Sequence, residues 1–117
     1  MRRLYHAHRN SDEGRERALI YLRQAAEAGD ADSQNDLALE LILGKHEDRS
    51  EIVSWYRKAA LQGHRVAAWS LGQIYEEGDG VPKDSEKAFE WYRMAALRGH
   101  ELAQQKIKQT SCNSEAN

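Results

Sequence analysis

The chain has 117 residues, of which 40% are hydrophobic and 31% charged, with a single proline. A chain of this length forms one domain with a modest core, and its supply of Ala, Leu, Glu, Lys and Arg is typical of a mainly helical protein. The 17 basic and 19 acidic residues are interspersed and give a formal net charge of −2. Without a basic block or a basic-aromatic stripe, the sequence predicts no nucleic-acid partner.

No segment of the sequence has the pattern of a targeting or membrane-spanning element. The stretch "LYHAHRN" follows Arg2 and Arg3 where a signal peptide needs an apolar region, and no apolar run approaches the length of a membrane span. The sequence therefore predicts no membrane partner and a cytoplasmic location. Cys112 is the single cysteine, which excludes an intrachain disulfide and a cysteine-based zinc site.

The first two expected helices span residues 15–28 and 31–43. The earlier one contains "YLRQAAEAGD" and places apolar residues at the spacing of a buried helix stripe, namely Ala18, Tyr21, Leu22, Ala25 and Ala26. The later one spaces Ser33, Leu37 and Leu41 four residues apart, which puts them on one helix face. Between the two, Gly29 offers a left-handed position at which the first helix ends and the chain reverses.

The next two expected helices, 50–62 and 65–77, repeat this arrangement. "WYRKAALQGH" aligns with the earlier phrase at a spacing of 34 residues, and Gly63 takes the place of the earlier glycine. The stripe of the first of these helices consists of Ile52, Trp55, Tyr56, Ala59 and Ala60. The helix that follows it presents Ala67, Leu71 and Tyr75 on one face.

The last two expected helices, 85–98 and 101–109, carry the pattern a third time. "WYRMAALRGH" follows after 36 residues, and the two extra residues fall in the loop "GDGVPKD", where Pro82 cannot continue a helix and Asp84 or Ser85 can cap the next one. The stripe consists of Ala88, Trp91, Tyr92, Ala95 and Ala96. Gly99 ends this helix, and the closing helix carries Ala103 and Ile107 on one face.

Repetition at this period predicts stacked helical hairpins. Large aromatic residues fill the space between neighbouring helices, and each alanine pair lets another helix backbone approach closely. We expect a single domain over 1–110, made of a partial repeat at 1–30, repeats at 31–64 and 65–100 and a partial closing helix at 101–110, with a polar tail at 111–117. Such an array is near the minimum of about three repeats, so its truncated ends must be covered or frayed.

Residues 65–100, "RVAAWSLGQIYEEGDGVPKDSEKAFEWYRMAALRGH", resemble the Sel1-like repeat, a relative of the tetratricopeptide repeat. The resemblance extends over 31–64, where Ala38 replaces the glycine seen at Gly72, and more weakly over 4–30. It implies an all-α, right-handed α/α superhelix with a concave binding surface and a role as a protein-interaction adaptor. Some bacterial members resemble immunity proteins that neutralise a secreted toxin, and the sequence does not separate these two roles.

Helix phase suggests where a partner would bind. Trp69 lies about 200° around its helix from Ala67 and Leu71, so we expect it to point from the core toward the concave face. Leu39 has the same phase one repeat earlier, with Ile42 and Leu43 beyond it. An apolar centre with a polar rim is typical of an interface. The expected partner-binding set is Asn35, Leu39, Ile42, Leu43, Trp69, Gln73, Glu76, Gln105 and Gln109.

Two alternatives stay open for this surface. The segment around Leu4 and Tyr5 could fold over Leu39, Ile42 and Leu43 and make them part of the core. Trp69 could instead be partly buried against a neighbouring first helix of a hairpin.

The sequence offers no chemical site. His6 and His8 do not share a helix face, and His64 and His100 hold equivalent turn positions that repetition explains better than metal ligation. No Ser-His-Asp order, HExxH motif, phosphate loop or nucleotide fingerprint is present. We therefore expect no catalysis, no cofactor, no metal and a protein or peptide partner. An enzyme of unknown reaction is the remaining alternative, and the truncated ends would also allow homodimerisation.

Overall fold

The computed structural model describes the backbone of residues 12–44 and 48–116. This part of the chain contains six α-helices and no strand. They follow the expected order and are α2 (Asp12–Glu27), α3 (Ala31–Leu43), α4 (Arg49–Leu61), α5 (Arg65–Glu77), α6 (Ser85–Leu97) and α7 (Glu101–Ala116). Five of the six helices end within two residues of the predicted position, because glycine turns or loops follow them.

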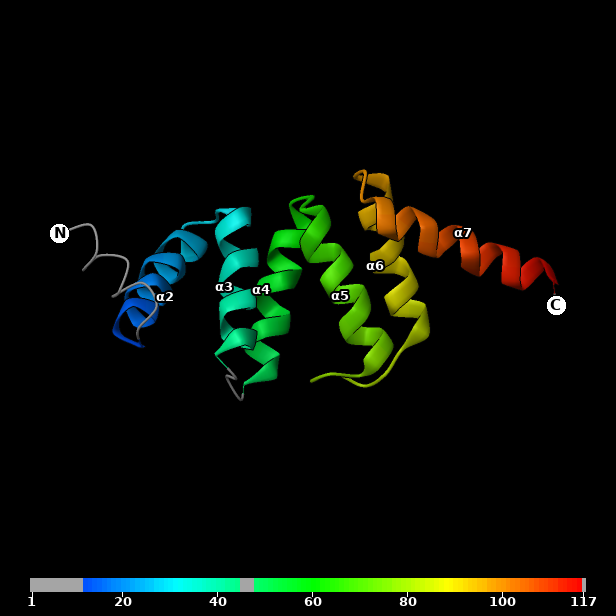
Figure 1. The fold of residues 1–117 in the computed structure, drawn as a ribbon. Coiled ribbons are helices and arrows are strands. Elements are labelled where there is room, and N and C mark those ends of the chain that lie inside the picture. Colours follow the sequence, from blue (N-terminus) through cyan, green and yellow to red (C-terminus); the bar gives the residue numbers. More distant parts are fainter. Residues whose placement is uncertain (1–11, 45–47, 117) are drawn as a thin grey trace.

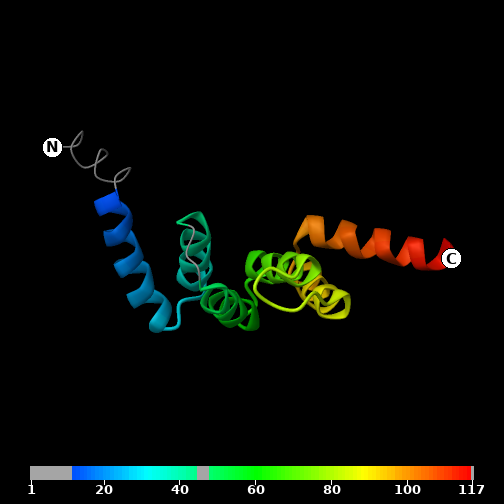
Figure 2. The same ribbon diagram turned by 90° about the horizontal axis from the view of Figure 1, so that it is seen from below.

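Successive helices run up and down in a single row, each packed on the next (Figure 1). The row is elongated, with extents of 61 × 27 × 25 Å. Seen from below, α3, α5 and α7 lie on one side of the row and α4 and α6 on the other (Figure 2). The expected all-α, right-handed α/α superhelix of helical hairpins is confirmed.

The three predicted glycine turns form as the sequence suggested and lie along the upper edge in Figure 1. Gly29, Gly63 and Gly99 have φ of 102°, 96° and 94°. Residues that carry a Cβ atom rarely adopt such positive φ values. After α4, the amide of His64 donates to the carbonyl of Ala59 at 3.1 Å, and that of Gly63 to the carbonyl of Ala60 at 2.9 Å. This pair of bonds satisfies the last carbonyls of the helix, and it recurs at the other two turns.

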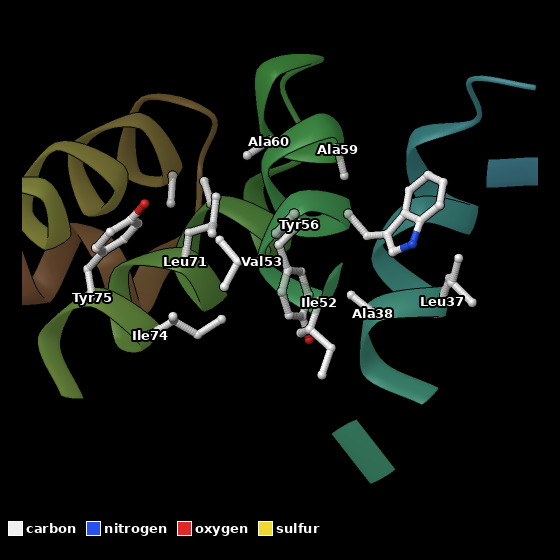
Figure 3. Packing of buried hydrophobic residues seen from close by; sticks show 14 of the residues in the cluster. Leu37, Ala38, Ile52, Val53, Tyr56, Ala59, Ala60, Leu71, Ile74 and Tyr75 are labelled. Carbon is white, nitrogen blue, oxygen red and sulfur yellow. The ribbon is translucent and has the colours of Figure 1, made fainter. Parts of the chain in front are cut away.

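The core follows the predicted stripes most closely in the middle of the row. All five stripe residues of α4 are buried, and Figure 3 shows four of them, Ile52, Tyr56, Ala59 and Ala60, between α3 and α5. In α6, Ala88, Tyr92 and Ala95 are buried, whereas Trp91 and Ala96 are half-buried.

The stripe predicted for α2 is confirmed only in part, with Leu22 and Ala25 half-buried. Ala26 is buried, but Ala18 is exposed and Tyr21 is 71% exposed. Among the described helices α2 packs chiefly against α3, whereas α4 packs against both α3 and α5, so Ala18 and Tyr21 stay open to solvent.

One position brings two helices unusually close. A Cβ atom added to Gly72 in α5 would lie 2.4 Å from Cε1 and 2.5 Å from Cδ1 of Tyr92 in α6. Both residues are buried, so the ring has little freedom to move aside. The α5–α6 crossing therefore requires glycine here.

The closing helix extends further than expected. It continues to Ala116 instead of ending near Gln109, and so includes most of the segment expected as a polar tail. The residues after Gln109 contain no glycine or proline that would stop a helix, and their polarity alone does not end one.

Replacing Gly72 by alanine should destabilise the fold. Helix propensity alone would favour alanine by about 1 kcal/mol. Overpacking against the Tyr92 ring typically costs about 1 to 3 kcal/mol, occasionally more, and at this close contact we expect a net loss of about 1 kcal/mol or more. Urea unfolding of Gly72→Ala beside Gln73→Ala, an exposed neighbour, measures the effect. A gain in stability for Gly72→Ala would contradict the crossing described above.

The alanine pairs give a second prediction, with a control built into the repeat. Ala60→Leu should lower the free energy of unfolding by about 1 to 3 kcal/mol, because the site is buried and has no room for the added atoms. Ala96→Leu changes the equivalent but half-buried position and should cost less. Equal melting temperatures for both variants and the parent protein would show that α4 is not closely packed at Ala60.

Candidate partner-binding surface

The apolar part of the expected surface lies on α3. Leu39 and Leu43 are 44% and 56% exposed, whereas Ile42 is half-buried and packs against the core. The alternative in which the segment around Leu4 and Tyr5 covers these residues lies outside the described residues. Within the described part of the chain, two leucines of this cluster are open to solvent.

Trp69 is half-buried, and two other rings hold it in place. Its ring centroid lies 4.9 Å from that of His100, with the planes at 15°, and 4.9 Å from that of Tyr92, with the planes at 48°. The stacked and tilted geometries are those that aromatic pairs favour. The partial burial therefore involves α6 and the turn that follows it. A partly exposed indole with a fixed orientation can make contacts at little cost in side-chain entropy.

Glu76 ties three helices together beside the indole. Its carboxylate accepts a hydrogen bond from the hydroxyl of Tyr92 at 3.2 Å and pairs with the ammonium group of Lys106 at 2.9 Å. The Lys106 nitrogen also lies 5.3 Å from the centroid of the Tyr92 ring. Burial and the adjacent Glu76 carboxylate raise the pKa of Tyr92 well above its usual range, so this hydroxyl stays a donor.

Three of the four expected amide residues are exposed on α5 and α7, namely Gln73, Gln105 and Gln109. Asn35 differs from the rim position expected for it, because it is only 8% exposed. It occupies the repeat position of Trp69, which is half-buried. Its Oδ1 has no hydrogen-bond partner among the described residues.

The structure gives His64 and His100 a role that repetition alone did not reveal. Each Nδ1 accepts a hydrogen bond from the backbone amide three residues later, at 3.2 Å, and so caps α5 or α7. The Nε2 atom of His64 lies 3.0 Å from a carboxylate oxygen of Asp32 in α3, which ties two hairpins together. Asp30 caps α3 at the equivalent position of the first turn. In the sequence, a histidine directly after a helix-ending glycine is the signal that could have predicted this capping role.

The ring of His100 combines capping with stacking on Trp69. Burial lowers the pKa of His100, the positive charge of Arg65 lowers it further, and Glu101 acts in the opposite direction. A neutral ring is also what the cap requires, because only an unprotonated Nδ1 can accept a hydrogen bond. The capping hydrogen bond and the electrostatic surroundings therefore both favour the neutral form of the His100 ring.

Two further properties of the described residues bear on function. They contain no group of three or more His, Cys, Asp or Glu side chains that could hold a metal ion. None of the helices in the described ranges is long and apolar enough to cross a membrane.

These features define a helical-repeat solenoid that presents one face built by the first helices of its hairpins. The Sel1 repeat model matches residues 12–30, 31–64 and 65–100, so the chain belongs to the Sel1 repeat family. Proteins of this family are typically protein-interaction scaffolds and generally non-catalytic binding modules.

Similar proteins include two solved structures. A Sel1 repeat protein from Oxalobacter formigenes is 36% identical, with a TM-score of 0.76 over 92% of this chain and 84% of that chain. A protective antigen present in uropathogenic Escherichia coli strains, which displays an SLR fold, is 40% identical, with a TM-score of 0.71 over 76% of this chain and 20% of that one.

Two curated relatives are longer proteins with different descriptions. The DAP3-binding cell death enhancer 1 of Rattus norvegicus is 34% identical over 78 residues, which are 67% of this chain and 15% of that protein. The exopolysaccharide production negative regulator of Rhizobium leguminosarum bv. viciae is 41% identical over 44 residues, which are 38% of this chain and 16% of that protein. The matched segments thus span under a fifth of either relative.

The His100 cap predicts a pH dependence of stability. Because folding lowers the pKa of His100 below its ordinary value of 6.5, the stabilisation from the neutral ring is fully present above pH 6.5 and is lost as the pH falls below that value. His100→Asn keeps a capping acceptor without titrating in this range. Urea unfolding at about pH 7.5 and about pH 5 should show a larger loss on acidification for the parent protein than for the variant. Identical losses would contradict the assignment.

Proposed function

We propose that this chain is a non-catalytic interaction module that binds a protein or peptide partner on the face formed by α3, α5 and α7. The half-exposed Trp69, held by His100 and Tyr92, is the observation that carries the proposal. Aromatic side chains of fixed orientation dominate the energetics of many interfaces. Leu39, Leu43 and the half-buried Ile42 extend the apolar part of this face on α3.

Polar residues provide the rim in this proposal. Gln73, Gln105 and Gln109 are exposed, and Glu76 is held by two hydrogen-bonding partners. A satisfied carboxylate and free amides provide directional contacts without an unpaired buried charge. Asn35 would act differently, because its buried Oδ1 can contribute only if a partner group or water reaches it.

The biological role of the complex depends on which partner protein is bound. A general adaptor and a toxin-neutralising immunity protein would use the same face, and the identity of the captured protein separates them. A cytoplasmic location is part of the proposal and is tested by fractionating cells of the native host.

Site-specific photo-crosslinking in the native host tests the binding face. A photoreactive phenylalanine analogue at Gln73 or Leu43 should crosslink the same partner protein, because both side chains are exposed on the first helices. The matched control is Ser54, which is exposed on α4 at the opposite side of the row. A partner that crosslinks from Ser54 but from neither other position would overturn the assignment of the face.

The indole itself is tested by titration with the captured partner. Trp69→Ala should weaken binding by about 2 kcal/mol or more, as for a central aromatic contact. Because the ring also stacks on His100 and Tyr92, some loss of stability is expected too, and binding is measured well below the melting temperature of the variant. Unchanged affinity of the folded variant would show that Trp69 has only a structural role.

A further inference from the structure

Two of the three glycine turns are flanked by exposed apolar side chains that the binding face does not use. Leu61 and Val66 flank the α4–α5 turn, and Leu97 and Leu102 hold the matching positions at the α6–α7 turn. Leu61 is 66% exposed and Leu97 is 85% exposed. We call these four residues, with Arg65, Arg93, Met94 and Arg98, the turn-edge surface. Both turns lie on the same edge of the row (Figure 1).

The exposure of these side chains does not come from a missing neighbour. The α4–α5 turn lies in the middle of the row, with helices on both sides, and Leu61 and Val66 are still open to solvent. The turn does not need them either, since the hydrogen bonds that close it come from Gly63 and His64. Folding therefore explains the glycine and the histidine of each turn but not the apolar pair beside them.

Two open hollows lie along this edge. One, of about 480 Å³, is lined by Glu90, Arg93, Met94, Leu97 and Arg98. The other, of about 280 Å³, is lined by Asp32, Gly63, His64, Arg65 and Val66. Arg98 joins them, because a Cβ atom on Gly63 would lie 3.0 Å from Cζ of its guanidinium group. Arg98 thus connects the hollow beside Val66 with the hollow beside Leu97.

The charges of the hollows favour a negatively charged occupant. Their lining includes three arginines, Arg65, Arg93 and Arg98, and two carboxylates, those of Asp32 and Glu90. Asp32 already faces the ring of His64. None of the three arginines pairs with a carboxylate within the described ranges. Free guanidinium groups beside leucines suit a ligand that offers both carboxylates and apolar side chains.

We propose that the turn-edge surface is a second docking site, which binds an acidic amphipathic segment of a partner protein. Apolar side chains of that segment would contact Leu61, Leu97 and Met94, and its carboxylates would pair with Arg65, Arg93 and Arg98. This site lies at the turns that join the hairpins, at the edge of the face of α3, α5 and α7, because Arg65 and Val66 begin α5 and Leu102 lies in the first turn of α7.

Selection from a random phage-displayed peptide library on the purified protein tests this proposal. Peptides that bind the turn-edge surface should combine Leu-like residues with Asp or Glu. Synthesised with a fluorescent label, they should bind the Leu97→Ser and Arg98→Gln variants about tenfold or more weakly in anisotropy titrations. Added salt should weaken binding, because the arginine contacts are exposed. Leu43→Ser, at an exposed leucine of the other face, is the matched control and should leave the affinity unchanged.

Several results would overturn the proposal. They are the absence of acidic, leucine-bearing peptides among those selected, and binding that Leu43→Ser weakens but Leu97→Ser and Leu61→Ser do not. Sedimentation that shows a dimer dissociated by Leu97→Ser would mean that a second copy covers this surface. The crosslinking test of the proposed function uses positions on the other face and a native partner. It can therefore succeed even if no peptide binds the turn-edge surface.

Discussion

The contact between Gly72 and the ring of Tyr92 sets the geometry on which much of the proposed binding face depends. At this point α5 and α6 approach so closely that a single added methyl group would overlap the ring. The crossing holds Tyr92 against Trp69 and brings its hydroxyl to Glu76. His100, which caps the helix that follows, stacks on the ring of Trp69. A close packing contact thus determines the orientation of residues that face solvent.

The recurring phrase "AALxGH" can now be interpreted residue by residue. Its alanines lie at or near the helix crossings and supply the carbonyls that close the turn, its glycine takes the left-handed position, and its histidine caps the next helix. The leucine is the exception, because both copies point into solvent. A residue repeated without a structural role in its own turn is a reason to look for a ligand on that edge.

Periodicity was sufficient to predict most of the architecture. Apolar spacing identified the helices, and the three glycines located the turns, because both signals are local in the chain. The prediction was less successful where burial depends on neighbours. Tyr21 has the same helix phase as the buried Trp55, yet it is exposed, because among the described helices α2 packs chiefly on α3 whereas α4 packs on both α3 and α5.

For the candidate site, too, local signals in the sequence were predictive and contacts with distant residues were not. Helix phase placed Trp69 near the surface, but it could not identify His100 and Tyr92 as its stacking partners, which come from a helix and a turn later in the chain. It also could not distinguish Asn35 from Trp69, since the two share a phase but differ in burial. Contacts with residues distant in the sequence determine these details.

A double-mutant cycle between Gly72→Ala and Tyr92→Val tests the central contact most directly. Valine removes the ring atoms that an alanine at residue 72 would strike. If the contact controls the crossing, Gly72→Ala should be far less harmful in the Tyr92→Val background, with a coupling free energy of about 1 kcal/mol or more in urea unfolding. Additive effects of the two substitutions would contradict this account, because they would mean that the two positions do not constrain one another.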